Sequence, residues 1–216
     1  RALGVERLRP LMPVGYAAGA DAYRRAAADL TAADLTDHYT AGMHWLREVF
    51  APELKARLAA LGDNAGVAVR ALANTALSAG QQLRVSRTLR KLRPEGRLAP
   101  LGALRLGVLS NATFKPLVPA VEVAGARHGV DLQIEVGPYD QAVQTAQDRK
   151  APIHECDAVL IALHNGGLGL GPHLDVNTAQ MAVDRALARV EAIRSGIHEH
   201  GDGIAIIQTV PRPNGA

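Results

Sequence analysis

The pattern of apolar and polar positions divides the chain into two parts with different periods. Over residues 1–100 the apolar residues recur at helical spacing, and no segment alternates or runs as a strand does. The expected helices cover residues 17–30, 43–61 (with a restart at Pro52) and 67–92. This part of the chain is therefore predicted to be an all-helical segment or cap.

A linker is predicted at Pro94, Gly96 and Pro100, and beyond it short apolar runs alternate with helical patterns. The expected strands are 104–109, 132–136, 158–163 and 204–210, and the expected helices are 117–128, 139–149 and 183–197. Regular alternation of strands and helices is typical of an α/β fold with a doubly wound parallel sheet. We expect two domains, 1–100 and 101–216, the second with a flavodoxin-like sheet.

The last predicted helix has the clearest amphipathic pattern in the chain. Its expected buried stripe consists of Val183, Ala186, Leu187, Val190, Ile193 and Ile197. The sequence then ends directly after the fourth predicted strand, where a further helix would normally cover the sheet. An uncovered last strand leaves one sheet face exposed, so we expect this α/β domain to be incomplete at its C-terminus and to belong to a longer protein.

Composition and charge exclude several classes of protein. Lys and Arg number 24 against 21 Asp and Glu, and a net charge of +3 is too small to indicate a nucleic-acid-binding face. The single cysteine, Cys156, cannot form an internal disulfide, and the apolar run 158–163 is too short to span a bilayer. We expect a cytoplasmic protein that binds neither nucleic acid nor membrane.

Two polar turns follow the first and third predicted strands. The carboxyl ends of neighbouring parallel strands lie at the same edge of a sheet, where ligands commonly bind. The expected binding residues are Ser110, Asn111, Ala112, Thr113, His164, Asn165, Gly166 and Gly167. For His164, a local hydrogen bond at a strand end is the simpler interpretation, and a place in a ligand pocket is the alternative. The glycines fit either a plain connection or a close approach of backbone to ligand.

This layout resembles the SGNH hydrolase fold, in which a Gly-Asp-Ser turn carries the nucleophile and a later turn carries an oxyanion-hole Asn. On that pattern Asn165 matches the oxyanion Asn, whereas Ala112 falls where the serine should be. Without a hydroxyl at that position, covalent acyl transfer has no starting group. Ser110 and Asn165 are the candidate catalytic residues, and an esterase that uses Ser110 in a shifted register stays open as an alternative.

A second resemblance lies in three segments that match in order and spacing. Leu106–Asn111, Tyr139–Gln147 and Asp157–Leu163 resemble the amino-terminal region of FkbH-like proteins, in subfamily IIIC of the HAD superfamily. The resemblance implies a parent enzyme that takes a glyceryl unit from a phosphorylated glycerate and loads it onto an acyl carrier protein. It also implies that a HAD part does the phosphoryl chemistry with Asp-x-Asp-x-Thr and Mg²⁺.

The Asp-x-Asp-x-Thr motif is absent from this chain, so the resemblance places it, and Mg²⁺, in a part of the protein outside this sequence. We expect this region to be non-catalytic, with no cofactor or metal of its own. Its expected partners are an acyl carrier protein and a small phosphorylated or acyl substrate. A cobalamin-binding module is excluded because the Asp-x-His-x-x-Gly turn after the first strand is replaced by Ser-Asn-Ala-Thr.

One basic run and the lone thiol need a separate interpretation. The run consists of Arg84, Arg87, Arg90, Lys91, Arg93 and Arg97. A solvated helix face is the expected interpretation, and docking of an acidic carrier protein is the alternative. Cys156, just before the third strand, is expected to be a small packed residue rather than a nucleophile.

Overall fold

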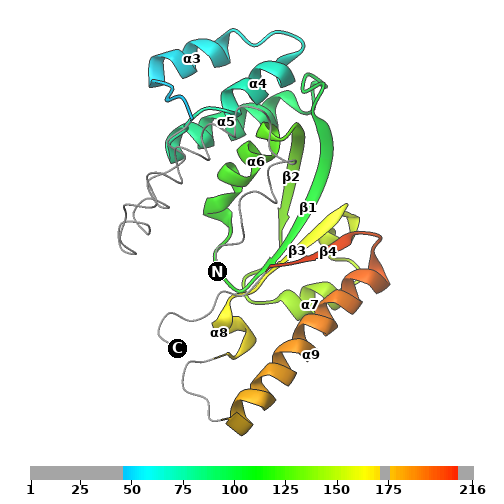
Figure 1. Ribbon diagram of the computed structural model, residues 1–216. Helices are drawn as coiled ribbons and strands as arrows, with labels where there is room; N and C mark the ends of the chain where they lie inside the picture. The colour runs from blue at the N-terminus through cyan, green and yellow to red at the C-terminus, as the bar shows by residue number, and fades with distance from the viewer. Residues whose placement is uncertain (1–45, 171–175, 209–216) are drawn as a thin grey trace, which may run out of the picture. The chain divides into compact units, whose positions relative to one another are not determined.

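The computed structural model describes residues 46–170 and 176–208, and these residues form an α/β fold, which confirms the predicted fold class. Four parallel strands lie in the order β2-β1-β3-β4 (Figure 1). The strands are β1 (Gly102–Ser110), β2 (Val130–Val136), β3 (Ala158–Ala162) and β4 (Ile204–Ile207). The chain reverses its direction of travel across the sheet between β1 and β3, so the switch point that favours ligand binding lies between these two strands.

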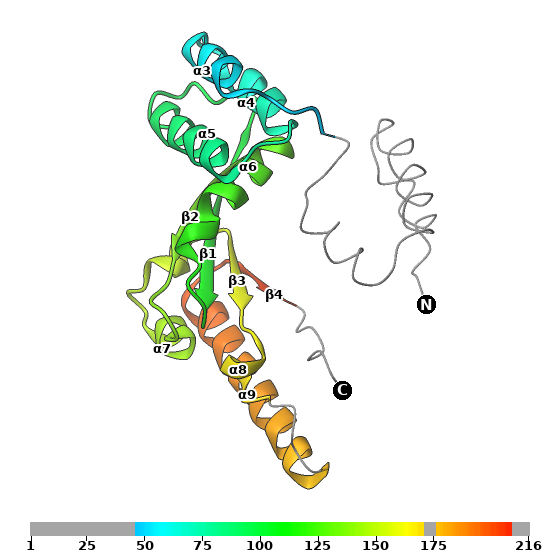
Figure 2. The same cartoon turned by 90° about the vertical axis from the view of Figure 1, so that its left-hand side faces the viewer.

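Helices cover both faces of the sheet (Figures 1 and 2). The helix α6 (Val118–Arg127) lies on the face that buries Leu106, Val108 and Leu132. The opposite face buries Leu109 and Ile161. On that face lie α7 (Ala142–Gln147), the 3₁₀ turn η3 (Pro152–Glu155) and α9 (Val176–His200). Residues 106–110 of β1 and the strand β3 are thus buried on both sides, as central parallel strands should be.

Three helices precede the sheet, and their boundaries correct the expectation for this segment. They are α3 (Ala51–Ala59), α4 (Ala65–Ala73) and α5 (Ala79–Leu92). The helix expected from residue 43 begins only at Ala51, next to Pro52, because proline is suited to a first helical turn. The helix expected over 67–92 is interrupted before Ser78, whose N–H donates to the Gln81 side chain at 2.8 Å. This Ser-x-x-Gln pattern starts a new helix. The helix expected over 17–30 lies outside the described residues.

The chain divides into two compact units. Arg1–Phe50 with Asn74–Ala76 form the first, and within it Ala76 donates its N–H to the Arg47 carbonyl at 2.9 Å. Ala51–Ala73 with Leu77–Ala216 form the second, which holds all the helices and strands named here. The predicted linker at 94–100 therefore lies inside the second unit. The expectation that the helical segment 1–100 forms a domain of its own stays a prediction.

Ion pairs join the helices to the sheet layer, and Arg90 and Arg93 of the basic run take part in them, whereas Arg84, Arg87 and Lys91 are exposed, as expected of a solvated face. Glu122 of α6 is buried and accepts hydrogen bonds from the Ser86 hydroxyl at 2.5 Å and from Arg90 Nε at 3.0 Å. Arg93 holds the buried Asp131 of β2 with three hydrogen bonds, at 2.8, 2.9 and 3.2 Å. A buried carboxylate must be paired, and the neighbouring helix supplies the cations.

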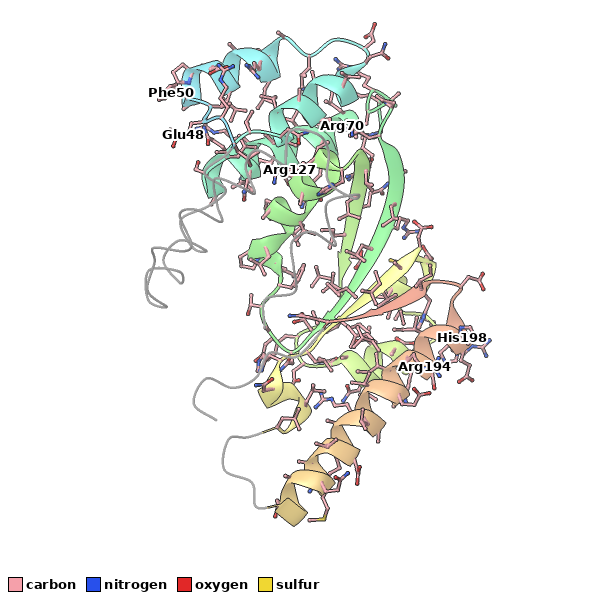
Figure 3. All side chains as sticks on the ribbon, in the orientation of Figure 1. Glu48, Phe50, Arg70, Arg127, Arg194 and His198 are labelled. Atoms are coloured by element: carbon pink, nitrogen blue, oxygen red, sulfur yellow. The ribbon has the colours of Figure 1, made fainter. Side chains whose placement is uncertain are left out.

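Two more arginines connect segments of the helical layer through backbone carbonyls. Arg97 donates to the carbonyls of Leu61 and Gly62, both at 2.9 Å. Arg127 of α6 donates at 2.7 Å to the Ala73 carbonyl, at the C-terminus of α4 (Figure 3). A helix C-terminus has unpaired carbonyls, so a guanidinium there satisfies the backbone as well as the dipole.

The long helix α9 corrects the predicted apolar stripe. Ala186, Ile193 and Ile197 are buried as expected, but Leu187 is 63% and Val183 43% exposed. Its 25 residues extend roughly 37 Å, whereas the neighbouring strands β3 and β4, at about 3.3 Å per residue, are less than half as long. Its N-terminal half consequently runs past the sheet (Figure 2).

The edge strand β4 exposes apolar side chains. Ile204 is 70% and Ile206 45% exposed. Among the described residues, no helix is long and apolar enough to cross a bilayer.

Candidate functional site

The two predicted polar turns lie together at the carboxyl edge of the sheet. Ser110, the last residue of β1, is in register with Ala162 of β3. Beyond the strands, the His164 N–H donates to the Asn111 side-chain oxygen at 2.9 Å. We call residues 110–113 and 164–167 the corner. The sequence placed both turns at one edge, and the structure adds a direct bond between them.

Asn111 is a buried structural element of the corner. Its side chain is 5% exposed, and it packs against Gly167 so closely that a Cβ on that glycine would collide with the amide group. Gly167 belongs to the short helix α8 (Asn165–Leu168), which begins within the predicted turn after the third strand. The glycine thus permits a close approach between α8 and the β1 turn, which is one of the two interpretations left open for it.

Ser110 lies under the surface of the corner, while its neighbours form the surface. The Ser110 hydroxyl is 5% exposed and accepts the Ala112 N–H at 3.0 Å, a local bond that stabilises the turn. Ala112 and Thr113 are exposed. The exposed tip of the turn therefore carries a methyl group at the position that resembles the SGNH nucleophile.

His164 caps the helix that follows it. Its ring Nδ1 accepts the Gly166 N–H at 3.1 Å, and the side chain is exposed. Since Nδ1 is an acceptor, the neutral ring carries its proton on Nε2. The local hydrogen bond that the sequence favoured is present, and the exposed ring also offers a donor at the surface of the corner.

Two charged residues that the sequence analysis missed border the corner. Arg189 of α9 donates from Nη1 to the Gly167 carbonyl at 2.6 Å and lies 3.5 Å from Asp140 Oδ1 through Nη2. The Asp140 N–H in turn donates to the Ser110 carbonyl at 3.2 Å. Arg189 was expected on the solvent face of its helix because it lies outside the apolar stripe. The one available signal was the Pro-Tyr-Asp turn after the second strand.

Asp140 has an unusual backbone for a residue with a side chain. Its φ is +53°, in the left-handed region that favours glycine and that aspartate tolerates better than most residues. Such conformations cluster at functional sites. The turn after β2 therefore belongs to the candidate site as well.

No metal centre is found in the part of the chain that the structure describes: no group of three or more His, Cys, Asp or Glu side chains there could hold an ion. The corner instead offers hydroxyl, imidazole, amide and guanidinium donors. Such an arrangement can bind a polar ligand.

A second concave region lies at the open edge of β2. It has a volume of about 240 Å³ and is lined by Arg90, Arg93, Arg105, Glu122, Gln133, Ile134, Glu135 and Cys156. Its arginines pair with Glu122, Asp131 and Glu155. Burial raises the pKa of the Cys156 thiol, which therefore stays protonated, as expected of a packed residue rather than a nucleophile.

Comparison with known proteins gives one remote similarity. No family model matches the chain, and no curated protein matches its sequence. A similar solved structure is the N-terminal part of a Bacteroides fragilis protein that contains a phosphatase domain, in complex with Mg. The TM-score is 0.49 and the identity 15%, over 65% of this chain and 35% of that one. The chain thus matches about a third of that structure's length.

Proposed function

We propose that the α/β domain is a non-hydrolytic binding module in the amino-terminal region of an FkbH-like glyceryl transferase/phosphatase. The corner is its binding surface. There it holds a small acyl or phosphorylated substrate and contacts the acyl carrier protein that receives the glyceryl unit. The phosphoryl chemistry takes place in a HAD-type part of the protein outside this sequence.

The methyl group of Ala112 is the observation that carries this proposal. It occupies the exposed tip of the β1 turn, where the resemblance to SGNH hydrolases requires a hydroxyl. The nearby Ser110 hydroxyl is buried and accepts the Ala112 N–H. A surface that keeps the shape of such a site without its nucleophile is suited to binding rather than acyl transfer.

Magnesium has no place in the proposed binding step. The resemblance assigns it to an Asp-x-Asp-x-Thr motif that this sequence lacks, and the residues of the corner include no carboxylate cluster. The ligand is therefore held by hydrogen bonds and charge at the corner.

The remaining basic residues of α5 support contact with an acidic carrier protein. Arg84, Arg87 and Lys91 are exposed and recur at helical spacing, and α5 contains no acidic residue. Arg90 and Arg93, in contrast, form ion pairs with Glu122 and Asp131. A cationic stripe of this kind attracts an acidic helix and accelerates its encounter.

The test is a titration of the ¹⁵N-labelled chain with an acyl carrier protein. Shifts of the amides at 110–113, 164–167 and the α5 stripe are expected. The double variant Arg87→Glu/Lys91→Glu should weaken binding at least tenfold at low salt. The matched control, Arg149→Glu/Lys150→Glu, reverses the same charge at exposed positions outside the stripe and should bind as the wild type does. Unchanged amides at both surfaces would contradict the proposal.

An ester assay separates binding from the esterase alternative. With an aryl ester as substrate, no turnover is expected above the buffer rate. Turnover that Ser110→Ala abolishes would replace the binding module with a hydrolase.

A further inference from the structure

We propose that the corner binds an oxyanion, a phosphate or carboxylate group, and that Arg189 is the residue that holds it. In the ligand-free protein the Asp140 carboxylate occupies the place of that anion. This inference rests on the proposed function, because it names the chemical group that the corner recognises.

The protein holds Nη1 of Arg189 firmly, whereas the contact that Nη2 makes can be replaced by a ligand. Its bond to the Gly167 carbonyl is short, 2.6 Å, and holds the guanidinium beside α8. Its contact with Asp140 is a single long one, 3.5 Å, and the Asp140 side chain is 54% exposed. In the described part of the chain, Arg189 Nε is buried without a hydrogen-bond partner. The guanidinium is thus positioned by the protein and only partly satisfied.

A structural ion pair in the same protein looks different. Arg93 and Asp131 make three hydrogen bonds, at 2.8, 2.9 and 3.2 Å, and Asp131 is only 6% exposed. A bidentate, buried pair is expected where a salt bridge fixes the fold. The long and exposed contact between Arg189 and Asp140 contributes little, and a ligand oxyanion with better geometry can displace the carboxylate.

The backbone holds the Asp140 carboxylate at the site. Its N–H bonds to the Ser110 carbonyl at the end of β1, and its φ of +53° turns the chain there. This turn brings the carboxylate to within 3.5 Å of Arg189 Nη2. In the proposal, the carboxylate keeps the guanidinium oriented until the ligand arrives.

The neighbouring groups suit an oxyanion. The exposed His164 ring carries a donor proton on Nε2, and Thr113 supplies an exposed hydroxyl on the facing turn. Asp140 and Arg189 are two charged residues whose hydrogen bonds reach the corner from outside it. Once Asp140 moves aside, the guanidinium of Arg189 brings an uncompensated positive charge to the corner.

The experiment titrates the 216-residue chain with inorganic phosphate, and separately with acetate, at ionic strength kept constant with sodium chloride. Saturable shifts of the Gly167 and Asp140 amides and of the Arg189 Nε–H signal are expected. The two arms distinguish phosphate from carboxylate as the preferred group. Shifts that chloride alone reproduces would overturn the proposal.

Two variants are expected to change the affinity for the anion in opposite directions. Arg189→Met should weaken anion binding at least tenfold. Asp140→Asn keeps the left-handed turn and the Arg189–Gly167 bond but removes the competing charge, so it should tighten binding about two- to fivefold, the factor that an exposed ion pair supplies. A purely structural pair predicts no tightening, and unchanged or weaker binding by Asp140→Asn would overturn the proposal.

Failure here is distinguishable from failure of the proposed function. If the carrier protein shifts the corner amides but phosphate and acetate do not, the binding module stands and the oxyanion assignment is wrong. If neither shifts them, both are wrong.

Discussion

The side-chain oxygen of Asn111 accepts the backbone N–H of His164 at 2.9 Å, across the ends of two neighbouring strands and 53 residues of sequence. This bond joins the two turns into one surface, whereas the sequence predicted only that both turns lie at the same edge of the sheet. Because Asn111 is buried, its amide is also part of the packing between the β1 turn and α8.

Gly167→Ala is expected to destabilise the fold. The new Cβ would collide with the Asn111 amide, and overpacking of this kind costs about 1–3 kcal/mol. Urea unfolding measures the change. Gly80→Ala is the control, since a Cβ there meets open space in the first turn of α5, and that variant should be as stable as the wild type or more so. Equal effects of the two substitutions would contradict the close approach.

Asn111→Ala should loosen the corner without unfolding the sheet. It leaves the His164 N–H without its acceptor, a loss of about 1–3 kcal/mol when the group is buried. Hydrogen exchange at the His164 amide should accelerate, while amides in the middle of β1 and β3 keep their protection. The exposed Thr113→Ala serves as the comparison and should change the free energy of unfolding by less than about 0.5 kcal/mol.

The buried carboxylate of Glu122 should be energetically coupled to Ser86. A hydrogen bond to a charged group contributes about 1.5–3 kcal/mol, and this one is short and buried. A double-mutant cycle with Ser86→Ala and Glu122→Gln isolates the coupling, which we expect to be at least about 1 kcal/mol. A cycle that pairs Glu122→Gln with the exposed Arg87→Ala should give a coupling near zero. Additive effects in the first cycle would show that the bond does not join α5 to α6.

The raised pKa of Cys156 predicts a stability loss at alkaline pH. Burial favours the neutral thiol, whose Sγ lies 3.8 Å from the Pro152 carbonyl. Above the ordinary thiol pKa of 9.0 the unfolded chain loses this proton while the folded chain keeps it. Since the folded state then binds more protons, the free energy of unfolding falls as pH rises through that value.

Cys156→Ala isolates the thiol's share of that loss. Urea unfolding at pH 8 and pH 10 should show a smaller alkaline decrease for the variant than for the wild type. Below pH 8 the difference between the two proteins should not depend on pH. Parallel curves across the whole range would show that the thiol is not the group responsible.

The fold class and the approximate strands and helices of the α/β part followed from the sequence, for a physical reason. Buried parallel strands must be apolar throughout, and a helix on a sheet must have an apolar stripe; both are properties of local sequence. The runs 104–109 and 158–163 and the helix 117–128 therefore lie within a residue or two of β1, β3 and α6. The break before α5 was missed, although its Ser78-x-x-Gln81 signal was present.

The parts that depended on distant neighbours were decided by the tertiary structure. Arg90 and Arg93 look like solvated helix residues until α6 and β2 bring buried carboxylates beside them. Leu187 looks buried until the helix proves longer than the strands that it covers. Both outcomes depend on residues that lie far away in sequence, and the periodicity of the helix itself contains no information about those residues.

By itself the sequence determined that two polar turns end neighbouring strands and that one of them carries Ala112 in place of a hydroxyl. The tertiary structure alone decided that Asn111 joins these turns, that Gly167 lies against it, and that Arg189 and Asp140 reach the same edge. The reason is that strand ends are set by local patterns, whereas contacts between side chains from four separate segments exist only once the sheet and α9 have packed together.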